Sequence, residues 1–413
     1  MRRRAVKYKG SVHWLGAAET TMSTVQLQEA TTLPRDGFAG ALIGRVWRPD
    51  VGGPSVVLAR DGALFDVTAA FATVSALCEA PDPAAAARAA PGEKLGSLAD
   101  ILANTPPDQR NAKLPWLLAP IDLQAVKAAG VTFASSMIER VIEERARGER
   151  GAAEAIRQDF AQRVGAELTS VKPGSPGAER LKQALVEAGA WSQYLEVGLG
   201  PDAEIFTKSQ PMSAIGTGAD AGFHSASAWN NPEPEVVLAV SSRGAIVGAT
   251  LGNDVNLRDF EGRSALLLGK AKDQNASCAI GPFLRLFDAT FSLDDVRRAE
   301  IGLTIAGEDG FTLQGGSSMA RISRDPADLV AQLIGPSHQY PDGAALFLGT
   351  MFAPVADRDA PGRGFTHKPG DLVTVSADKL GALTNRMRHS QNCPPWDFGA
   401  GALMRNLALR GLL

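Results

Sequence analysis

Residues 231–281 read NPEPEVVLAVSSRGAIVGATLGNDVNLRDFEGRSALLLGKAKDQNASCAIG, and this stretch decides the fold prediction. It contains two apolar runs, at 236–240 and 245–251, on either side of Ser242-Arg243-Gly244. Two runs rich in β-branched residues around a glycine-containing turn are typical of a β-hairpin. We therefore expect two antiparallel strands that fold back on each other at Arg243.

Three carboxylates lie at the open end of this predicted hairpin. Glu233 and Glu235 are two positions apart, so on an extended strand their side chains point to the same face. Folding the hairpin about its turn places Glu233 roughly opposite Asn253 and Asp254. Such a buried cluster repels itself unless a hard divalent cation such as Mg²⁺ or Mn²⁺ binds it through oxygen ligands. The alternative is a solvated strand edge, where Pro234 discourages further pairing.

Composition limits the class of protein. The chain has 413 residues, 45% of them hydrophobic and 21% charged, with a net charge of −3. This balance argues against a nucleic-acid partner, and no apolar run reaches the roughly 18 residues of a membrane span. The three cysteines are odd in number, widely spaced and not arranged as CxxC, which favours a reducing cytoplasm and gives no zinc motif.

The pattern along the chain suggests three parts. Residues 1–21 are expected to be a disordered extension, residues 22–115 a small N-terminal β domain, and residues 116–413 a larger domain. From Leu195 onward, short strand-like runs recur every 8 to 12 residues with few helices between them. This spacing favours an α+β, β-rich fold built on a mixed β sandwich or barrel over a βαβ repeat.

Residues 135–165 form a highly charged segment. Apolar residues recur there at helical spacing, and Glu and Arg fill most other positions. We expect a solvent-facing helix capped by Ser135 or Ser136, with Glu139 at the capping-box position relative to Ser136. A mobile lid over a site is the alternative.

Several of these motifs together resemble the fumarylacetoacetate hydrolase superfamily. They are the E-P-E at Glu233, the N-D-x-x-x-R-D that ends at Asp259, and a lysine ahead of the C-x-I-G-P at Cys278. Further matches are Phe206-Thr207-Lys208, Gly349-Thr350, Lys368-Pro369-Gly370-Asp371 and Leu383-Thr384-Asn385. The resemblance covers about residues 128–390 and implies that the larger domain is a catalytic mixed β sandwich or roll of this family.

The resemblance also implies roles for individual residues. Glu233, Glu235 and Asp254 are expected to bind Mg²⁺, or Mn²⁺ or Ca²⁺ in its place, and the metal to chelate the carboxylate and keto oxygens of a 2-oxo acid. The family lysine aligns with Lys272, and Lys270 is its competitor. The residues expected to contact substrate are Phe133, Ser136, Lys208, Arg258, Glu261 and Thr350. For Arg258, an internal ion pair with Asp259 that braces the hairpin is the alternative.

One departure from the family pattern points to a particular branch. Hydrolases of this family carry a histidine three residues before the glutamate that aligns with Glu139, and here Ser136 takes its place. Without that imidazole, activation of water lacks its usual base. The run Trp229-Asn230-Asn231-Pro232-Glu233-Pro234-Glu235 resembles 2-keto-3-deoxy sugar acid dehydratases, which lack the histidine.

The resemblance therefore favours Mg²⁺-dependent dehydration of a 2-keto-3-deoxy pentonate through a metal-held enolate. Lys272, with a lowered pKa, would remove the C3 proton, and Glu139 would protonate the leaving hydroxyl. The alternatives are hydrolysis of a C–C bond in an acylpyruvate, decarboxylation or tautomerisation of a 2-oxo acid, and metabolite binding without turnover. The family also implies a homodimer or higher homo-oligomer. We expect a cytoplasmic enzyme with neither nucleic acid nor membrane as a partner.

Overall fold

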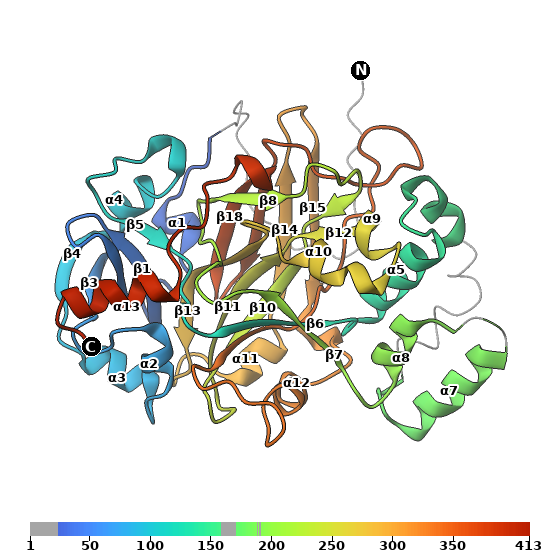
Figure 1. The fold of residues 1–413 in the computed structure, drawn as a ribbon, viewed down its shortest axis with the longest axis horizontal. Coiled ribbons are helices and arrows are strands. Elements are labelled where there is room, and N and C mark those ends of the chain that lie inside the picture. The colour runs from blue at the N-terminus through green and yellow to red at the C-terminus, as the bar shows by residue number, and fades with distance from the viewer. Residues whose placement is uncertain (1–23, 158–170, 188, 190) are drawn as a thin grey trace.

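The fold is a mixed α+β arrangement around one large sheet and one smaller sheet (Figure 1). The computed structural model describes residues 24–157, 171–187, 189 and 191–413. The expected extension at 1–21 lies outside the described residues. The two sheets and their covering helices confirm the predicted α+β class.

The large sheet has 11 strands in the order β4-β3-β2-β1-β13-β11-β10-β16-β6-β7, with β5 paired to β1. Its strands are β1 (Ala41–Arg48), β2 (Gly53–Arg60), β3 (Ala63–Asp66), β4 (Glu93–Ser97), β5 (Trp116–Leu118), β6 (Ala125–Gly130), β7 (Glu204–Ser209), β10 (Pro234–Val240), β11 (Ile246–Asp254), β13 (Cys278–Leu286) and β16 (Ala344–Phe347). Because Ala41 of β1 pairs with Leu286 of β13, the N-terminal strands continue the sheet that contains the hairpin. A domain boundary near residue 115 stays a prediction.

The smaller sheet has five strands in the order β15-β14-β17-β18-β8, and a two-stranded ladder joins β12 to β9. These strands are β8 (Asp220–Phe223), β9 (Asn230–Asn231), β12 (Asn256–Leu257), β14 (Glu300–Ala306), β15 (Thr312–Ser318), β17 (Leu372–Ala377) and β18 (Gly381–His389). The main core lies between the two sheets, where Leu238 of β10 packs in one buried cluster with Leu303 and Val375.

The predicted hairpin is present as β10 and β11, with Pro234 opposite Asn253 and a turn at 241–245. Every residue of β10 is buried. Leu238 faces the main core, while Val237 packs with Phe347 on the other side of the sheet. Burial on both faces explains why this strand reads as a continuous apolar run.

Helices cover the two ends and the lower side of the sheets (Figure 1). One group, α5, α7 and α8, lies at the opposite end of the molecule from α2, α3 and α13. The helices are α1 (Glu29–Thr32), α2 (Val74–Cys78), α3 (Pro83–Ala89), α4 (Leu98–Ala103), α5 (Ala134–Arg145), α7 (Pro176–Glu187), α8 (Gln193–Leu199), α9 (Arg258–Glu261), α10 (Leu268–Lys272), α11 (Leu293–Arg297), α12 (Pro326–Leu333) and α13 (Ala400–Leu409). Within the described residues, none of these helices combines the length and apolarity needed to cross a membrane.

Helix α5 corrects the prediction of a solvent-facing charged helix. It ends at Arg145, well before residue 165, and residues 158–170 lie outside the described part. Two of its charged residues, Arg140 and Glu143, are buried. The cap is also different, since Phe133 is the N-cap residue and Ser136 lies in the first turn. The pattern was misleading because buried ion pairs and solvated charges look the same in sequence.

Candidate active site

The three carboxylates of Glu233, Glu235 and Asp254 converge, as the hairpin predicted. Each side chain offers an oxygen within 4.8 Å of the others, and all three residues are buried. The register explains this. Glu233 directly precedes β10 and Glu235 is the second residue of that strand, while the amide of Asp254, the last residue of β11, donates to the Glu233 carbonyl at 3.0 Å.

Glu235 is the member of this trio whose charge is not offset by a side chain. Its Oε2 accepts a hydrogen bond of 2.7 Å from the Gly349 amide, and no lysine or arginine among the described residues pairs with it. Burial, and then the charges of Asp254 and Glu233, raise the pKa of Glu235 well above its usual value. A divalent cation would remove this penalty, so the donor set fits a hard metal ion.

Lys272 lies beside two members of the trio. Its ammonium donates to Asp254 Oδ2 at 2.9 Å and also to Glu233. Although burial opposes it, these two carboxylates raise the pKa of Lys272 in the metal-free protein, so the predicted lowering, which assumed a nearby metal, depends on that metal. The competitor Lys270 is exposed and lies over the Phe260 ring, which favours Lys272 as the family lysine.

Lys208 lies beside one member of the trio. It is completely buried, and its ammonium pairs with Asp254 at 2.8 Å and donates to the Lys272 carbonyl at 2.5 Å. It also donates to the Val255 carbonyl. Lys208 thus holds Asp254 in place, and its contact with substrate stays a prediction.

Arg140 connects helix α5 to the trio. It pairs with Glu143 at 2.6 Å, with Glu261 at 3.1 Å, and with Glu233. Burial raises the pKa of Glu261 to about 7, despite the nearby Arg140 charge. Glu261, which was expected to contact substrate, thus lies beside Arg140, the arginine that pairs with Glu233 of the trio.

Glu139 is committed to ion pairs and does not suit the predicted role of proton donor. It pairs with Arg157 at 2.8 Å and with Arg258 at 2.7 Å. Burial works against the charged form, but these arginines lower the pKa of Glu139 to about 2. A carboxylate held in this way is a poor acid at neutral pH.

For Arg258, contact with substrate stays a prediction, but the alternative ion pair with Asp259 is wrong. It pairs with Glu143 at 2.5 Å and lies 4.6 Å from the Trp229 ring, where it braces α5. Asp259 does not pair with it and instead accepts a hydrogen bond of 2.7 Å from Ser227.

The remaining predicted contacts are mostly enclosed by protein. Phe133 packs in the main core, and the Ser136 hydroxyl donates to the Phe133 carbonyl at 2.8 Å. Ser135 donates to the Met351 carbonyl, and the Ser136 hydroxyl accepts from the amide of Phe133, the N-cap residue, at 3.4 Å, so Ser136 contributes to the cap from the first turn. Thr350 follows Gly349, the residue that binds Glu235, and its hydroxyl donates to the Phe352 carbonyl at 3.1 Å.

Glu204 is a site residue that the sequence did not reveal. It opens β7, and its carboxylate lies so close to Gly130 that a Cβ there would collide with it. Burial raises the pKa of Glu204, and the charges acting on it include Lys272, Glu233 and Asp254. A lone glutamate at the start of a strand resembles an ordinary edge residue, so no sequence signal marks it.

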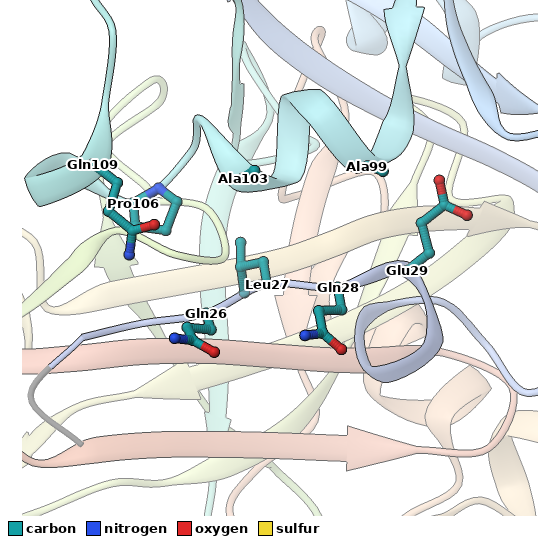
Figure 2. Close-up of a pocket in the computed structure, with 8 residues that line it drawn as sticks. All are labelled: Gln26, Leu27, Gln28, Glu29, Ala99, Ala103, Pro106 and Gln109. Atoms are coloured by element: carbon teal, nitrogen blue, oxygen red, sulfur yellow. The ribbon is translucent and has the colours of Figure 1, made fainter. Parts of the chain in front are cut away.

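A separate groove lies away from these carboxylates. It has a volume of about 510 Å³ and lies between the extended segment 26–28 and α4 (Figure 2). Its lining is Gln26, Leu27, Gln28, Glu29, Ala99, Ala103, Pro106 and Gln109. None of these side chains belongs to the acidic trio or its lysines, so the groove is distinct from the candidate active site.

Part of the chain is similar to known proteins. Residues 212–388 match the model of the fumarylacetoacetate (FAA) hydrolase C-terminal domain. A 2-dehydro-3-deoxy-D-arabinonate dehydratase from Saccharolobus solfataricus is 31% identical over 183 residues, which are 44% of this chain and 57% of that protein. A protein of Haloferax volcanii named "Probable 2-keto-3-deoxyxylonate dehydratase" is 29% identical over 199 residues, 48% of this chain and 65% of that protein. The chain thus spans less than two thirds of either relative.

The fold also has a solved counterpart. A structure of 2-keto-3-deoxy-D-arabinonate dehydratase, complexed with magnesium and 2,5-dioxopentanoate, has a TM-score of 0.55 to this chain. The two are 19% identical, and the match covers 84% of this chain and 99% of the other. At this identity the likeness establishes the fold, and the predicted fumarylacetoacetate-hydrolase-like architecture is confirmed.

Proposed function

We propose that the chain is a metal-dependent hydro-lyase of the fumarylacetoacetate hydrolase family that dehydrates a 2-keto-3-deoxy pentonate. Its residues 212–388 match the model of the fumarylacetoacetate (FAA) hydrolase C-terminal domain. The observation that carries the proposal is the convergence of Glu233, Glu235 and Asp254 beside a buried lysine, Lys272. The names of the two curated relatives support the same reaction class.

The acidic trio would hold Mg²⁺, or Mn²⁺ or Ca²⁺ in its place. When bound, such an ion polarises the keto oxygen and offsets the negative charge that develops as the C3 proton leaves. The magnesium in the similarly folded dehydratase supports this choice. In this chain, Lys208 and Arg140 would keep the ligand carboxylates in position through their ion pairs with Asp254 and Glu233.

We assign the two proton transfers of the elimination to Lys272 and Glu204. The elimination gives 5-hydroxy-2-oxopent-3-enoate; loss of a C5 proton and uptake of a proton at C3 then give the C4–C5 enol, which tautomerises to 2,5-dioxopentanoate. Lys272 would take the C3 proton once a bound cation replaces its ammonium as the countercharge for Glu233 and Asp254. Glu204 would protonate the departing C4 hydroxyl, because burial raises its pKa and it forms no ion pair with any described residue. Glu139 lacks both properties.

Dehydration is favoured over C–C hydrolysis by the lack of a suitable base for water. Ser136, at the position of the hydrolase histidine, uses its hydroxyl to bind the Phe133 carbonyl. Of the histidines in the described part of the chain, none forms a hydrogen bond or ion pair with the acidic trio; His367, for example, pairs with Asp371. Hydrolysis of an acylpyruvate is therefore the second candidate.

We further infer a cytoplasmic homo-oligomer. All three cysteines are buried and unpaired, which suits a reducing compartment. The C-terminal residues Met404, Leu409 and Leu413 expose apolar side chains that a second subunit could cover. Light scattering at increasing protein concentration tests the oligomer directly.

The carbon count of the product tests the proposed function. With Mg²⁺ and a ¹³C-labelled 2-keto-3-deoxypentonate, the account predicts that all five carbons stay in one molecule of 2,5-dioxopentanoate, with loss of one water. An acylpyruvate substrate should remain intact. Release of pyruvate from either substrate, or no conversion of the pentonate, contradicts the proposal.

A further inference from the structure

Two buried asparagines, Asn231 and Asn256, lie beside the acidic trio and have unused hydrogen-bonding atoms. Asn231 belongs to β9 and Asn256 to β12, and the two residues are opposite each other in that ladder. Both are 0% exposed. Their position and their free atoms suit the binding of a neutral polar group.

The register places this pair next to the trio. Asn231 is two residues before Glu233, and Asn256 is two residues after Asp254. The Asp254 amide donates to the Glu233 carbonyl at 3.0 Å, and the asparagines form a ladder pair further out in the same register. Two residues of a strand span about 7 Å, so the asparagine pair lies about that far along the strands from the two carboxylate residues.

The asparagines and the carboxylates share one face of these strands. Val255 and Leu257 pack in the main core. Asp254 and Asn256 alternate with them, so the side chains of Asp254 and Asn256 point away from that core. Residues opposite each other in an antiparallel pair lie on one face, so their cross-strand partners point the same way.

In the other direction along this face, beyond the trio, the space is filled by apolar packing. Val237 follows Glu235 on the face and packs with Phe347. A Cβ at Gly252, which lies opposite Glu235, would collide with both of these apolar side chains. A polar ligand that starts at the trio therefore meets hydrogen-bonding groups toward the asparagines and apolar packing toward the hairpin turn.

Three amide atoms of the pair have no hydrogen-bond partner within the described residues. They are Oδ1 and Nδ2 of Asn256 and Oδ1 of Asn231. Asn231 Nδ2 donates to the Pro232 carbonyl at 2.9 Å, which fixes the orientation of that amide. Buried polar atoms normally find a partner, so three free ones side by side call for a ligand or ordered water. In either orientation of its amide, Asn256 offers one donor group and one acceptor, and Asn231 adds a second acceptor.

We propose that Asn231 and Asn256 bind the terminal C5 hydroxyl of the sugar acid and make the site specific for it. This inference rests on the proposed function, in which the trio holds the metal and, through it, the oxo-acid end of the substrate. The hydroxyl accepts a hydrogen bond from Asn256 Nδ2 and donates one to Asn231 Oδ1. A hydroxyl uses both a donor and an acceptor, whereas a cation would use only acceptors and an anion only donors.

The test compares the wild type with Asn256→Leu, which has a similar shape and no hydrogen-bonding atoms. The substrates are 2-keto-3-deoxypentonate and 4-hydroxy-2-oxopentanoate, the analogue without the C5 hydroxyl; both can lose water across C3 and C4. We expect kcat/KM of the variant to fall at least about tenfold on the hydroxylated acid. On the analogue the variant should equal or exceed the wild type, because the wild-type amide stays unpaired there.

Stability distinguishes this role from a structural one. Since the Asn256 amide atoms are unpaired without ligand, neither Asn256→Leu nor the smaller Asn256→Ala should lower the urea midpoint. Asn392→Leu, at an exposed asparagine after β18, is the matched control and should leave both substrates unaffected. Destabilisation by both Asn256 variants, equal losses on both acids, or no loss on either overturns the inference.

The wild type alone gives a further check. Its kcat/KM should favour the hydroxylated acid by at least about tenfold, and equal values for the two acids overturn the inference whether or not a variant folds. A wild type that converts neither acid refutes the proposed function instead. Calorimetric binding of the two acids to the Mg²⁺-loaded proteins then decides the role of the pair. Weaker binding of only the hydroxylated acid by Asn256→Leu supports it, and equal or absent binding overturns it.

Discussion

The Lys272 ammonium lies 2.9 Å from Asp254 Oδ2 and also donates to Glu233, so the proposed base bonds directly to two proposed metal ligands. In the metal-free protein these carboxylates keep the lysine protonated, with a raised pKa. Metal binding and the generation of a neutral base are therefore linked through the same two side chains.

Lys272→Met should abolish most turnover without weakening the metal site. We expect kcat to fall about 10²- to 10⁴-fold, the usual contribution of a positioned base. Affinity for Mg²⁺ should stay the same or increase, because a competing ammonium has been removed. Lys270→Met, the exposed neighbour, is the control and should retain full activity. Substantial turnover by Lys272→Met argues against its role.

Two substitutions in the trio should have opposite effects on the metal-free protein. Asp254→Asn removes the charge that Lys208 and Lys272 share, so we expect a loss of about 3–5 kcal/mol of unfolding free energy. Glu235→Gln replaces a buried carboxyl group that has no side-chain counterion and whose ionised form burial disfavours, so it should be neutral or stabilising.

The same pair gives a metal readout. Mg²⁺ should raise the thermal midpoint of the wild type, and calorimetry should show at least about tenfold weaker binding by Glu235→Gln. Urea unfolding with a chelator present measures the stability difference. Comparable destabilisation by both substitutions, or unchanged Mg²⁺ affinity in Glu235→Gln, is incompatible with the proposed site.

Glu204→Gln and Glu139→Gln distinguish the revised proton donor from the one predicted from sequence. We expect Glu204→Gln to lower kcat by about 10²-fold or more with unchanged Mg²⁺ affinity. Glu139→Gln weakens two ion pairs with arginines, so it should cost about 1–3 kcal/mol of stability and leave kcat largely intact. If Glu139→Gln instead lowers kcat and Glu204→Gln leaves it intact, Glu139 is the acid.

Stability of the metal-free protein should fall as the pH rises from about 5 to about 7. Burial raises the pKa of Glu261 to about 7, whereas an unfolded glutamate titrates near about 4.3. Between these values the folded state holds a proton that the unfolded state has lost, so raising the pH favours unfolding, by at most about 1.4 kcal/mol per pH unit for one group.

Urea unfolding across this pH range, with a chelator present, should show that the unfolding free energy of Glu261→Gln changes less with pH than that of the wild type. The exposed Glu300→Gln is the control and should follow the wild type. Identical slopes in all three proteins mean that Glu261 is not the group responsible.

Local patterns gave the hairpin and its acidic end correctly. The turn at Gly244 and the two apolar runs determine the register, and the register alone brings Asp254 to Glu233. This inference works because strand periodicity is short-range and a shift of one residue would turn Glu235 to the other face.

The main errors at the site concern pairing between residues that are distant in the sequence. Arg140 pairs with Glu233, which is 93 residues away, and a charged helix gives no sign of such a partner. Glu204 also reaches the site only because β7 pairs with β6, so no local motif marks it. Likewise, the pairing of Ala41 with Leu286 joins the N-terminal strands to the hairpin sheet, and nothing in the first 115 residues predicts that partner.

The most direct test is turnover of 2-keto-3-deoxypentonate by chelator-treated protein while Mg²⁺ is restored stepwise. Rates should start near zero and rise along the same saturation curve that calorimetry gives for Mg²⁺ binding, while the Glu235→Gln protein stays inactive at those concentrations. Dehydration that proceeds fully in the presence of the chelator, or that is unchanged in Glu235→Gln, would contradict the central claim.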